Sequence, residues 1–341
     1  MNWEKYKEAF VRGCLEKNIP DVQVNKWLNY ANRLHSDDLP IIYDRMHLSY
    51  LLGYEWTLLR NIKNSQGKFY RTFKIPKRNE GVRVIKEPYP SLKEIQKWIL
   101  DNILRKVPVS RFAKAYVSQR NIIDNAKFHC NQKIVMKFDV KDFFGSISQD
   151  QIIKLFEKLG YTRDLSSILA GLCCLDDGLP QGAPTSPYLS NIFAKEIDDA
   201  LFSYLRTDGL YYTRYSDDIT ISGNIEERKI PEIMSYCNRL LGQYGLSLNR
   251  GKTKVLRPQH KHFVTGIVVN KKVSADRKLK RELRQQLYYI KKYGIESHIL
   301  HEGIRQERYL YHLMGKVQWV LFLEPQNKEF LEYCKILKDE V

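Results

Sequence analysis

The spacing of apolar positions predicts helices at both ends of the chain and a mixed region between them. Residues 1 to about 60 carry apolar side chains at helical spacing, such as Trp27, Leu28 and Leu34. A helical pattern returns at Arg277 and continues to the end. No internal repeat or low-complexity linker interrupts the chain. Both ends are therefore expected to be helical.

Short apolar runs in the middle of the chain predict strands. Two of them, separated by the turn residues 78–81, predict a hairpin. Two others flank Ser216, Asp217 and Asp218 and predict a second tight turn. The expected strands span 70–75, 82–85, 134–140, 210–215, 219–222 and 263–270. The expected helices between them span 92–104 (capped by Ser91), 149–159, 163–174, 187–205 and 230–244. This order indicates an α+β core.

The charge of the chain favours a polyanionic partner. It carries 56 Lys and Arg against 39 Asp and Glu, a net charge of +17. The excess is uneven, because residues 250–292 contain 14 basic and only 2 acidic residues. Binding a polyanion to such a surface is favourable since it releases counterions. We therefore expect a nucleic-acid binding face in this segment rather than a merely basic protein.

Cysteine usage and hydropathy suggest an intracellular, soluble protein. The 6 cysteines form no CxxC pair and show no metal-ligand spacing, so we expect reduced thiols. The opening MNWEKYKEAF has no apolar signal core. The longest apolar run, residues 317–323, is far shorter than a membrane span of about 20 residues. The sequence predicts a cytoplasmic location and no membrane partner.

Two segments place aspartates where strands end. In IVMKFDVKDFF, residues 134–144, an apolar strand delivers Asp139 at its end, where an isolated buried carboxylate would be costly unless paired or metal-bound. The alternative is an aspartate that caps the next turn. In RYSDDITIS, residues 214–222, a hairpin turn can present Asp217 and Asp218 together at one edge, although a plain surface turn is the alternative.

Together, Asp139, Asp217 and Asp218 could meet on one sheet. Three carboxylates can hold two Mg²⁺ ions roughly 3.5–4 Å apart, which activate an attacking hydroxyl and stabilise the leaving phosphate. Mg²⁺ prefers carboxylate oxygens and substrate phosphates over a full protein cage. The pattern therefore predicts nucleotidyl transfer with two Mg²⁺ ions as cofactor.

A third segment, GLPQGAPTSPYLSNIF at residues 178–193, is rich in Gly and Pro and precedes an expected helix. Such a segment lets backbone approach a ligand closely, although an ordinary loop is the alternative. FDVKDFF, LPQGAPTSP and YSDD occur in this order, and in this order they resemble the palm motifs of reverse transcriptases. The resemblance covers about residues 70–270. It implies a right-hand polymerase fold with fingers, a palm of antiparallel sheet plus helices, and a helical thumb.

Two shorter signatures narrow the resemblance to retron reverse transcriptases. Asn125 and His129 belong to NAKFH, which resembles an NAxxH signature, and Val264, Thr265 and Gly266 match a VTG signature. A structural histidine is the alternative for His129, and a strand with a glycine bulge is the alternative for VTG. The resemblance implies consecutive parts: a helical region at 1–60, fingers with part of the palm at 61–133, palm at 134–260, and a primer-grip strand with a basic thumb at 261–341.

The resemblance also implies roles for single residues. Arg83 would contact the incoming triphosphate, with Lys74 and Lys77 as further members of the same site, and Phe144 would exclude a 2′-hydroxyl. Gln181 and Gly182 would position template and nucleotide. Lys252 would act as general acid, although a solvated lysine of a basic run is the alternative. Besides the two signatures, the expected RNA-binding residues are Lys271, Lys272, Arg277, Lys278, Lys280, Arg281 and Arg284.

The implied function is an RNA-directed DNA polymerase that copies a structured non-coding RNA into single-stranded DNA (msDNA). Priming would start from a guanosine 2′-hydroxyl of that RNA, and the enzyme would serve antiphage defence with an effector protein. Only about 120 residues follow Asp218 and they lack clustered acids, so a host RNase H is expected to trim the template. The alternatives are a group II intron-like or diversity-generating reverse transcriptase, and a non-catalytic RNA-binding scaffold that restrains a toxin.

Overall fold

The computed structural model describes residues 2–76, 81–301, 303 and 309–339. Contacts between Cα atoms divide the chain into two compact units. Unit 1 comprises Met1–Ser118, Val140–Leu201 and Met234–Asn249, and unit 2 comprises Gln119–Asp139, Phe202–Ile233 and Arg250–Val341. Each unit is therefore assembled from segments far apart in the sequence. The predicted consecutive parts remain a prediction.

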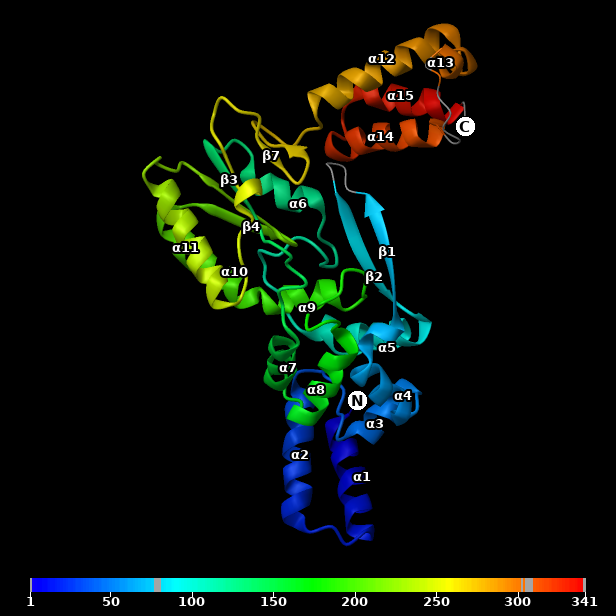
Figure 1. Ribbon diagram of the computed structural model, residues 1–341, viewed down its shortest axis with the longest axis vertical. Coiled ribbons are helices and arrows are strands. Elements are labelled where there is room, and N and C mark those ends of the chain that lie inside the picture. The colour runs from blue at the N-terminus through cyan, green and yellow to red at the C-terminus, as the bar shows by residue number, and fades with distance from the viewer. Residues whose placement is uncertain (1, 77–80, 302, 304–308, 340–341) are drawn as a thin grey trace. The chain divides into compact units, whose positions relative to one another are not determined.

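Unit 1 is mainly helical and includes one antiparallel hairpin of β1 and β2 (Figure 1). The register pairs Tyr70 with Pro88 and Pro76 with Val82. The α1 and α2 helices pack through Cys14, Val24 and Leu28. The elements are α1 (Trp3–Glu16), α2 (Asp21–Ser36), α3 (Arg45–Leu52), α4 (Trp56–Asn64), β1 (Tyr70–Pro76), β2 (Val82–Pro88), α5 (Pro90–Asn102), α7 (Gln149–Lys158), α8 (Arg163–Cys173), α9 (Ser186–Phe193) and parts of α10 (Lys195–Leu205) and α11 (Lys229–Gln243).

Unit 2 is built on a four-stranded antiparallel sheet in the order β4-β5-β3-β6. Successive side chains of a strand point to opposite faces, so the register assigns each residue to a face. One face carries apolar side chains such as Phe138, Ile219 and Ile221, all buried. The strands are β3 (Ile134–Asp139), β4 (Tyr211–Tyr215), β5 (Asp218–Gly223) and β6 (Lys254–Leu256).

The other face of this sheet, which we call the polar face, carries three rows of side chains across the strands. Directly opposed residues of antiparallel strands share a face. The first row contains Ser222, Val135 and Leu256, the second Thr220, Lys137 and Lys254, and the third Asp218 and Asp139. The order of these rows places lysines between an apolar end and an acidic end of the same face.

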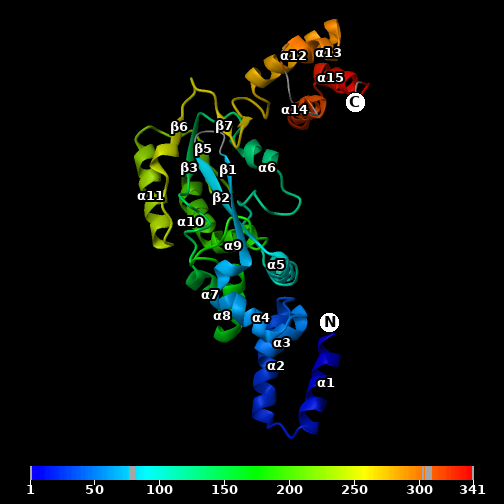
Figure 2. The same cartoon turned by 45° about the vertical axis from the view of Figure 1, so that its right-hand side comes forward.

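Helices and a short hairpin complete unit 2, and they share one hydrophobic core with the sheet. Val135 of β3, Ala126 of α6, Val264 and Ile267 of the hairpin, and residues of the terminal helices are buried together. Full burial of a valine or isoleucine side chain contributes about 1.5–3 kcal/mol. Figures 1 and 2 show the terminal helices as one group. The elements are α6 (Ile122–Ala126), β7 (Phe263–Val264), β8 (Ile267–Val268), α12 (Arg277–Tyr293), α13 (Ile295–His301), α14 (Tyr309–Leu323) and α15 (Lys328–Asp339).

The predicted helices and strands agree with the structure except at two places, although α6 and β6 lie where no element was expected. Residues 78–80 of the predicted turn lie outside the described residues. The helix expected over 187–205 is divided into α9 and α10 on either side of Ala194. The strand expected over 263–270 is a tight hairpin, because Thr265 and Gly266 turn the chain with φ of 48° and 84°. All six cysteines are free thiols. Within the described part of the chain, no helix is long and apolar enough to cross a membrane.

Candidate active site

The three predicted catalytic acids meet at one end of the sheet in unit 2. Asp139 at the end of β3 is the Cα partner of Asp218 at the start of β5. Opposed Cα atoms of antiparallel strands lie roughly 4.5–5.5 Å apart, so these two side chains are neighbours on the polar face. Ser216 and Asp217 form the turn between β4 and β5, and Ser216 has a φ of 60°. The turn therefore brings Asp217 beside the facing pair.

Burial and mutual repulsion disfavour three charged carboxylates here. The pKa of Asp217 is raised, first by burial and also by the nearby Asp139 charge. The pKa of Asp218 is raised by burial and then by the charge of Asp217. Positive charge from Lys252 acts in the opposite direction on both acids. A site with these properties attracts cations.

Lys252 supplies one such positive charge directly. It lies in the 3₁₀ turn Arg250–Lys252 that precedes β6. Its Nζ donates a hydrogen bond of 3.0 Å to Oδ2 of Asp139 and forms an ion pair with Oδ1 at 2.9 Å. The Lys252 side chain is 63% exposed whereas that of Asp139 is only 12% exposed. Lys252 is thus an exposed lysine whose ammonium contacts a mostly buried acid, and its role as general acid stays a prediction.

The oxygen ligands that this site offers suit a hard divalent cation. Three carboxylates from β3 and the β4–β5 turn provide oxygen ligands of the kind that Mg²⁺ and similar ions prefer. Among the described residues, no group of three or more His, Cys, Asp or Glu side chains is already arranged to hold a metal ion. Since the ammonium of Lys252 contacts both oxygens of Asp139, we expect it to move when a cation binds.

Lys137 was not among the predicted site residues, yet it lies on the same face two positions before Asp139. Burial lowers the pKa of Lys137, while the charge of Asp218 raises it. Lys254 of β6 lies directly opposite Lys137. The signal was present in KFD, because alternate residues of a strand share a face.

The predicted nucleotide-binding residues that the structure describes lie in unit 1. Arg83 is exposed on β2. The carbonyl of Gln181 accepts a hydrogen bond of 2.8 Å from the Lys86 N–H, which joins the Gly- and Pro-rich loop to β2. Gly182 has a φ of 130°, and a Cβ there would lie 2.7 Å from the Lys86 carbonyl oxygen, so this position requires glycine.

Phe144 also lies in unit 1 and is half-buried. Its ring centroid lies 6.4 Å from that of Tyr116. Lys77 lies outside the described residues, and Lys74 is exposed on β1. The Gly- and Pro-rich loop, Phe144 and β2 therefore all belong to unit 1. Their roles in nucleotide binding stay predictions.

The two short signatures contact one another inside unit 2. The Asn125 amide lies 3.4 Å from the Thr265 hydroxyl. His129 is fully buried and bridges two strands: its Nδ1 lies 2.7 Å from Ser222 Oγ and its Nε2 lies 2.7 Å from Thr213 Oγ1. These contacts tie α6 and the following turn to the β4–β5 hairpin.

This burial corrects the prediction that the signatures contact RNA directly. Asn125, His129 and Val264 are each 0% exposed and have no surface to offer a ligand. The structural-histidine alternative therefore describes His129. Thr265 is half-buried and Gly266 is exposed at the tip of the β7–β8 hairpin, where a direct contact remains a prediction.

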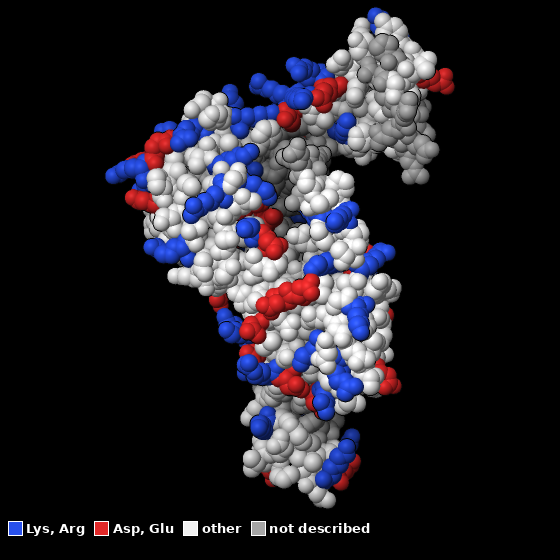
Figure 3. Space-filling model, in the orientation of Figure 1, with Lys and Arg blue, Asp and Glu red and all other residues white. Residues whose placement is uncertain are grey.

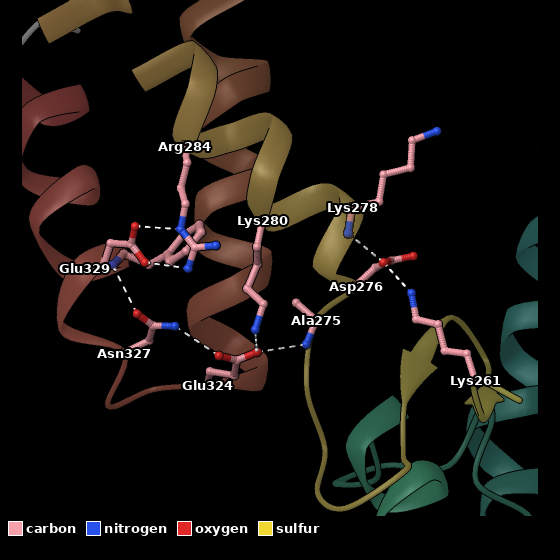
Figure 4. A network of polar contacts seen from close by, with 10 residues as sticks. Lys261, Ala275, Asp276, Lys278, Lys280, Arg284, Glu324, Asn327 and Glu329 are labelled. Atoms are coloured by element: carbon pink, nitrogen blue, oxygen red, sulfur yellow. Dashed lines mark hydrogen bonds and ion pairs between the residues drawn. The ribbon is translucent and has the colours of Figure 1, made fainter. Parts of the chain in front are cut away.

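Two predicted RNA-binding residues of α12 are instead engaged within the helical group (Figure 4). Lys280 lies 2.8 Å from Glu324, and the two side chains are 16% and 14% exposed. Arg284 donates twice to Glu329, at 2.7 Å each. The ion pair and the low exposure of Lys280 argue against a direct RNA contact, which stays a prediction. Arg284 remains half-exposed but is already paired by two hydrogen bonds.

The remaining predicted RNA-binding residues are at the surface. Figure 3 shows basic side chains close to the start of α12, with acidic side chains beside them. Lys278 has one weak ion pair, at 4.0 Å from Glu282. Besides Gly266 and Arg284, the exposed members of the predicted set are Lys271, Lys272, Arg277, Lys278 and Arg281.

Comparison with known proteins agrees with this site. Residues 75–274, more than half of the chain, match the model of the family described as reverse transcriptase (RNA-dependent DNA polymerase). The retron Ec86 reverse transcriptase of Escherichia coli is 32% identical over 270 residues, which cover 78% of this chain and 84% of that protein. The retron Mx65 reverse transcriptase of Myxococcus xanthus is 31% identical over 283 residues, covering 77% and 64%.

Solved structures are more distant. A foamy viral protease-reverse transcriptase in complex with double-stranded DNA is 16% identical, with a TM-score of 0.46, and covers 79% of this chain and 38% of that chain. Similarity at this level carries no argument about function. The family match and the retron relatives do bear on function. The α+β class predicted from the sequence is confirmed. The chain therefore belongs to the reverse transcriptase family, as a retron-type RNA-directed DNA polymerase.

Proposed function

We propose that this reverse transcriptase copies a structured non-coding RNA into single-stranded DNA, with Asp139, Asp217 and Asp218 as its catalytic acids. The observation that carries the proposal is the pairing of Asp139 with Asp218 beside the Asp217 turn. Three crowded acids at one sheet end are costly unless they serve a cation. Nucleotidyl transfer requires such a site.

The proposed cofactor is a pair of Mg²⁺ ions held by these three carboxylates. When bound, the ions would lower the pKa of the attacking hydroxyl and neutralise charge on the leaving group. The primer hydroxyl would attack the α-phosphate of a dNTP and lose its proton to solvent. A new P–O bond would form at the α-phosphorus while the bond to the oxygen that bridges to the β-phosphate breaks, so that pyrophosphate leaves. Lys252, released from Asp139, would give its proton to the leaving pyrophosphate.

The incoming dNTP is proposed to contact residues of unit 1. Arg83 and Lys77 would pair with its triphosphate, because both can carry charge-assisted hydrogen bonds. Gln181 and Gly182 would position the nucleotide through the loop whose backbone already bonds to β2. Phe144 would exclude nucleotides that carry a 2′-hydroxyl. These assignments rest on the resemblance of the motifs to those of reverse transcriptases.

The template and primer are proposed to be one RNA, with synthesis starting from the 2′-hydroxyl of a guanosine to give branched msDNA. Support comes from the retron relatives and from the exposed basic residues beside α12. RNA is recognised mainly through shape, loops and 2′-hydroxyls. We further propose that the enzyme acts in the bacterial cytoplasm in antiphage defence, with an effector protein and a host RNase H.

Primer extension tests the enzymatic part. Wild-type protein should extend an annealed DNA primer on RNA with Mg²⁺ and dNTPs, and Asp217→Asn or Asp218→Asn should abolish extension. Asp199→Asn, at an exposed position of α10, is the matched control and should extend like wild type. Equal extension by wild type and the Asp218→Asn variant would refute the assignment.

Sequencing of nucleic acid that copurifies with the protein tests the retron part. A compact RNA joined to DNA at one guanosine is expected, and debranching enzyme should separate the two strands. Recovery of unbranched DNA primed on unrelated transcripts would refute 2′-priming while leaving polymerase activity intact.

A further inference from the structure

Two lysines face each other on the polar face of the unit 2 sheet, next to the row of catalytic acids. Lys137 of β3 and Lys254 of β6 are direct cross-strand partners. We propose that Lys137 and Lys254 form a subsite that binds a backbone phosphate of the primer strand. The proposal rests on the proposed function and names a contact for its primer.

The placement follows from the register. Val135, Lys137 and Asp139 alternate along β3 and share one face. An antiparallel strand rises about 6.8 Å over two residues, so the lysine row lies about that far from the acid row. Consecutive phosphates of a nucleic-acid strand have a similar separation. When the reacting end of a primer lies at the acids, its preceding phosphate can therefore lie at the lysines.

The energetics of the lysine row favour an anion. Like charges directly opposite one another on neighbouring strands destabilise a sheet. Among the described residues, neither ammonium has an ion pair or hydrogen bond, whereas the ammonium of Lys252 contacts both oxygens of Asp139. Asp139 and Asp218 of the adjacent row attract Lys137, but these acids are the proposed cation ligands. A phosphate between the lysines would remove their repulsion.

The surroundings limit which ligand can reach the lysines. On the far side of the lysine row, Val135 and Leu256 belong to or pack against the buried core, so the face is closed there. Lys137 is half-buried and Lys254 is exposed. An anion therefore approaches from the side of the acids or over β6. A nucleic-acid strand that continues past the acids meets these conditions better than a small ion does.

The salt dependence of binding provides the test. We would measure the affinity of a labelled RNA–DNA primer–template duplex in EDTA over a range of KCl concentrations. Wild type should show a linear decrease of log K with log salt. The double variant Lys137→Met/Lys254→Met should flatten this slope by about 0.7–0.9, the value for one lost phosphate contact. Lys137→Arg should keep the wild-type slope because it keeps the charge.

Controls separate this contact from other roles. Lys26→Met, an exposed lysine of α2 in unit 1, should leave the slope unchanged. Lys254→Met alone should flatten the slope in part, and as a surface change it should not disturb folding. An unchanged slope in the double variant, or a change only in KM for dNTP, would overturn the subsite while wild-type extension still supports the polymerase. Failure of wild type to bind and extend would instead refute the proposed function.

Discussion

The ammonium of Lys252 lies within 3.0 Å of both carboxylate oxygens of Asp139. A lysine so placed can have two roles: it can hold the acid in position, or it can deliver a proton during the reaction. The two roles predict different outcomes for variants that keep or remove the positive charge.

Lys252→Met should lower kcat for primer extension by about 10²–10⁴-fold, the usual contribution of a general acid. Lys252→Arg should not rescue it, since a guanidinium keeps the charge near Asp139 but does not release its proton. Single-turnover extension as a function of pH measures this effect. Rescue by arginine would instead assign Lys252 to positioning Asp139.

Asp218→Asn should raise stability while abolishing activity. Because burial and Asp217 raise its pKa, folded protein binds a proton at Asp218 at higher pH than unfolded chain does. Stability therefore falls as pH rises through that window, and the charged acid is a cost at neutral pH. A neutral amide removes this cost. Thermal melts in EDTA at pH 7 should show a Tm increase of a few degrees.

The same comparison at lower pH provides the control for Asp218. Below the raised pKa both proteins are neutral at this position, so the difference in Tm should shrink. Asp199→Asn should show no difference at either pH. A Tm of Asp218→Asn below that of wild type at pH 7 would contradict the prediction.

His129→Ala should destabilise unit 2 without a specific loss of RNA affinity. The change leaves the buried hydroxyls of Thr213 and Ser222 without their histidine partner, and a buried unsatisfied group costs about 1–3 kcal/mol. Urea denaturation should show a lower midpoint. RNA binding, measured well below the unfolding range, should remain close to wild type. Reduced affinity with an unchanged midpoint would restore the prediction of a direct contact.

Lys280→Met should destabilise the helical group by roughly 2–3 kcal/mol, somewhat less than loss of one partner from a fully buried pair. The buried Glu324 would lose its ion pair, although Asn327 and the Ala275 N–H still donate to it. The double variant Lys280→Met/Glu324→Leu should recover part of the loss, because no unpaired charge remains. Urea denaturation measures both.

The pH dependence of stability provides a second test of the contacts around Glu324. Burial raises the pKa of Glu324. The hydrogen bonds from Lys280 and other donors lower it by more, so that the pKa lies below its usual range. Its contribution to stability is therefore present above the ordinary glutamate pKa and lost as pH falls through the lowered value. The destabilisation caused by Lys280→Met should shrink over the same acid range.

The sequence predicted the strands around Asp139 and around Asp217 and Asp218 to within a few residues, because apolar runs and a tight turn are local signals. The interruption at Ala194 was missed, since both halves of 187–205 carry the same helical pattern. The partner of Lys280 lies 44 residues away, and the partners of His129 lie 84 and 93 residues away. Local periodicity contains no information about such distant pairs.

The alternation along β3 makes its length as important as its composition. One face of β3 carries three residues with different roles. Val135 packs in the core, Lys137 is proposed to contact a phosphate, and Asp139 is proposed to take part in the reaction. Deleting or inserting one residue between them would turn every later side chain to the opposite face. We expect libraries of single-residue insertions to tolerate changes near the exposed turn at 206–209 and to reject them throughout 134–139. Relatives of this enzyme should therefore differ in loop length long before they differ in the length of this strand.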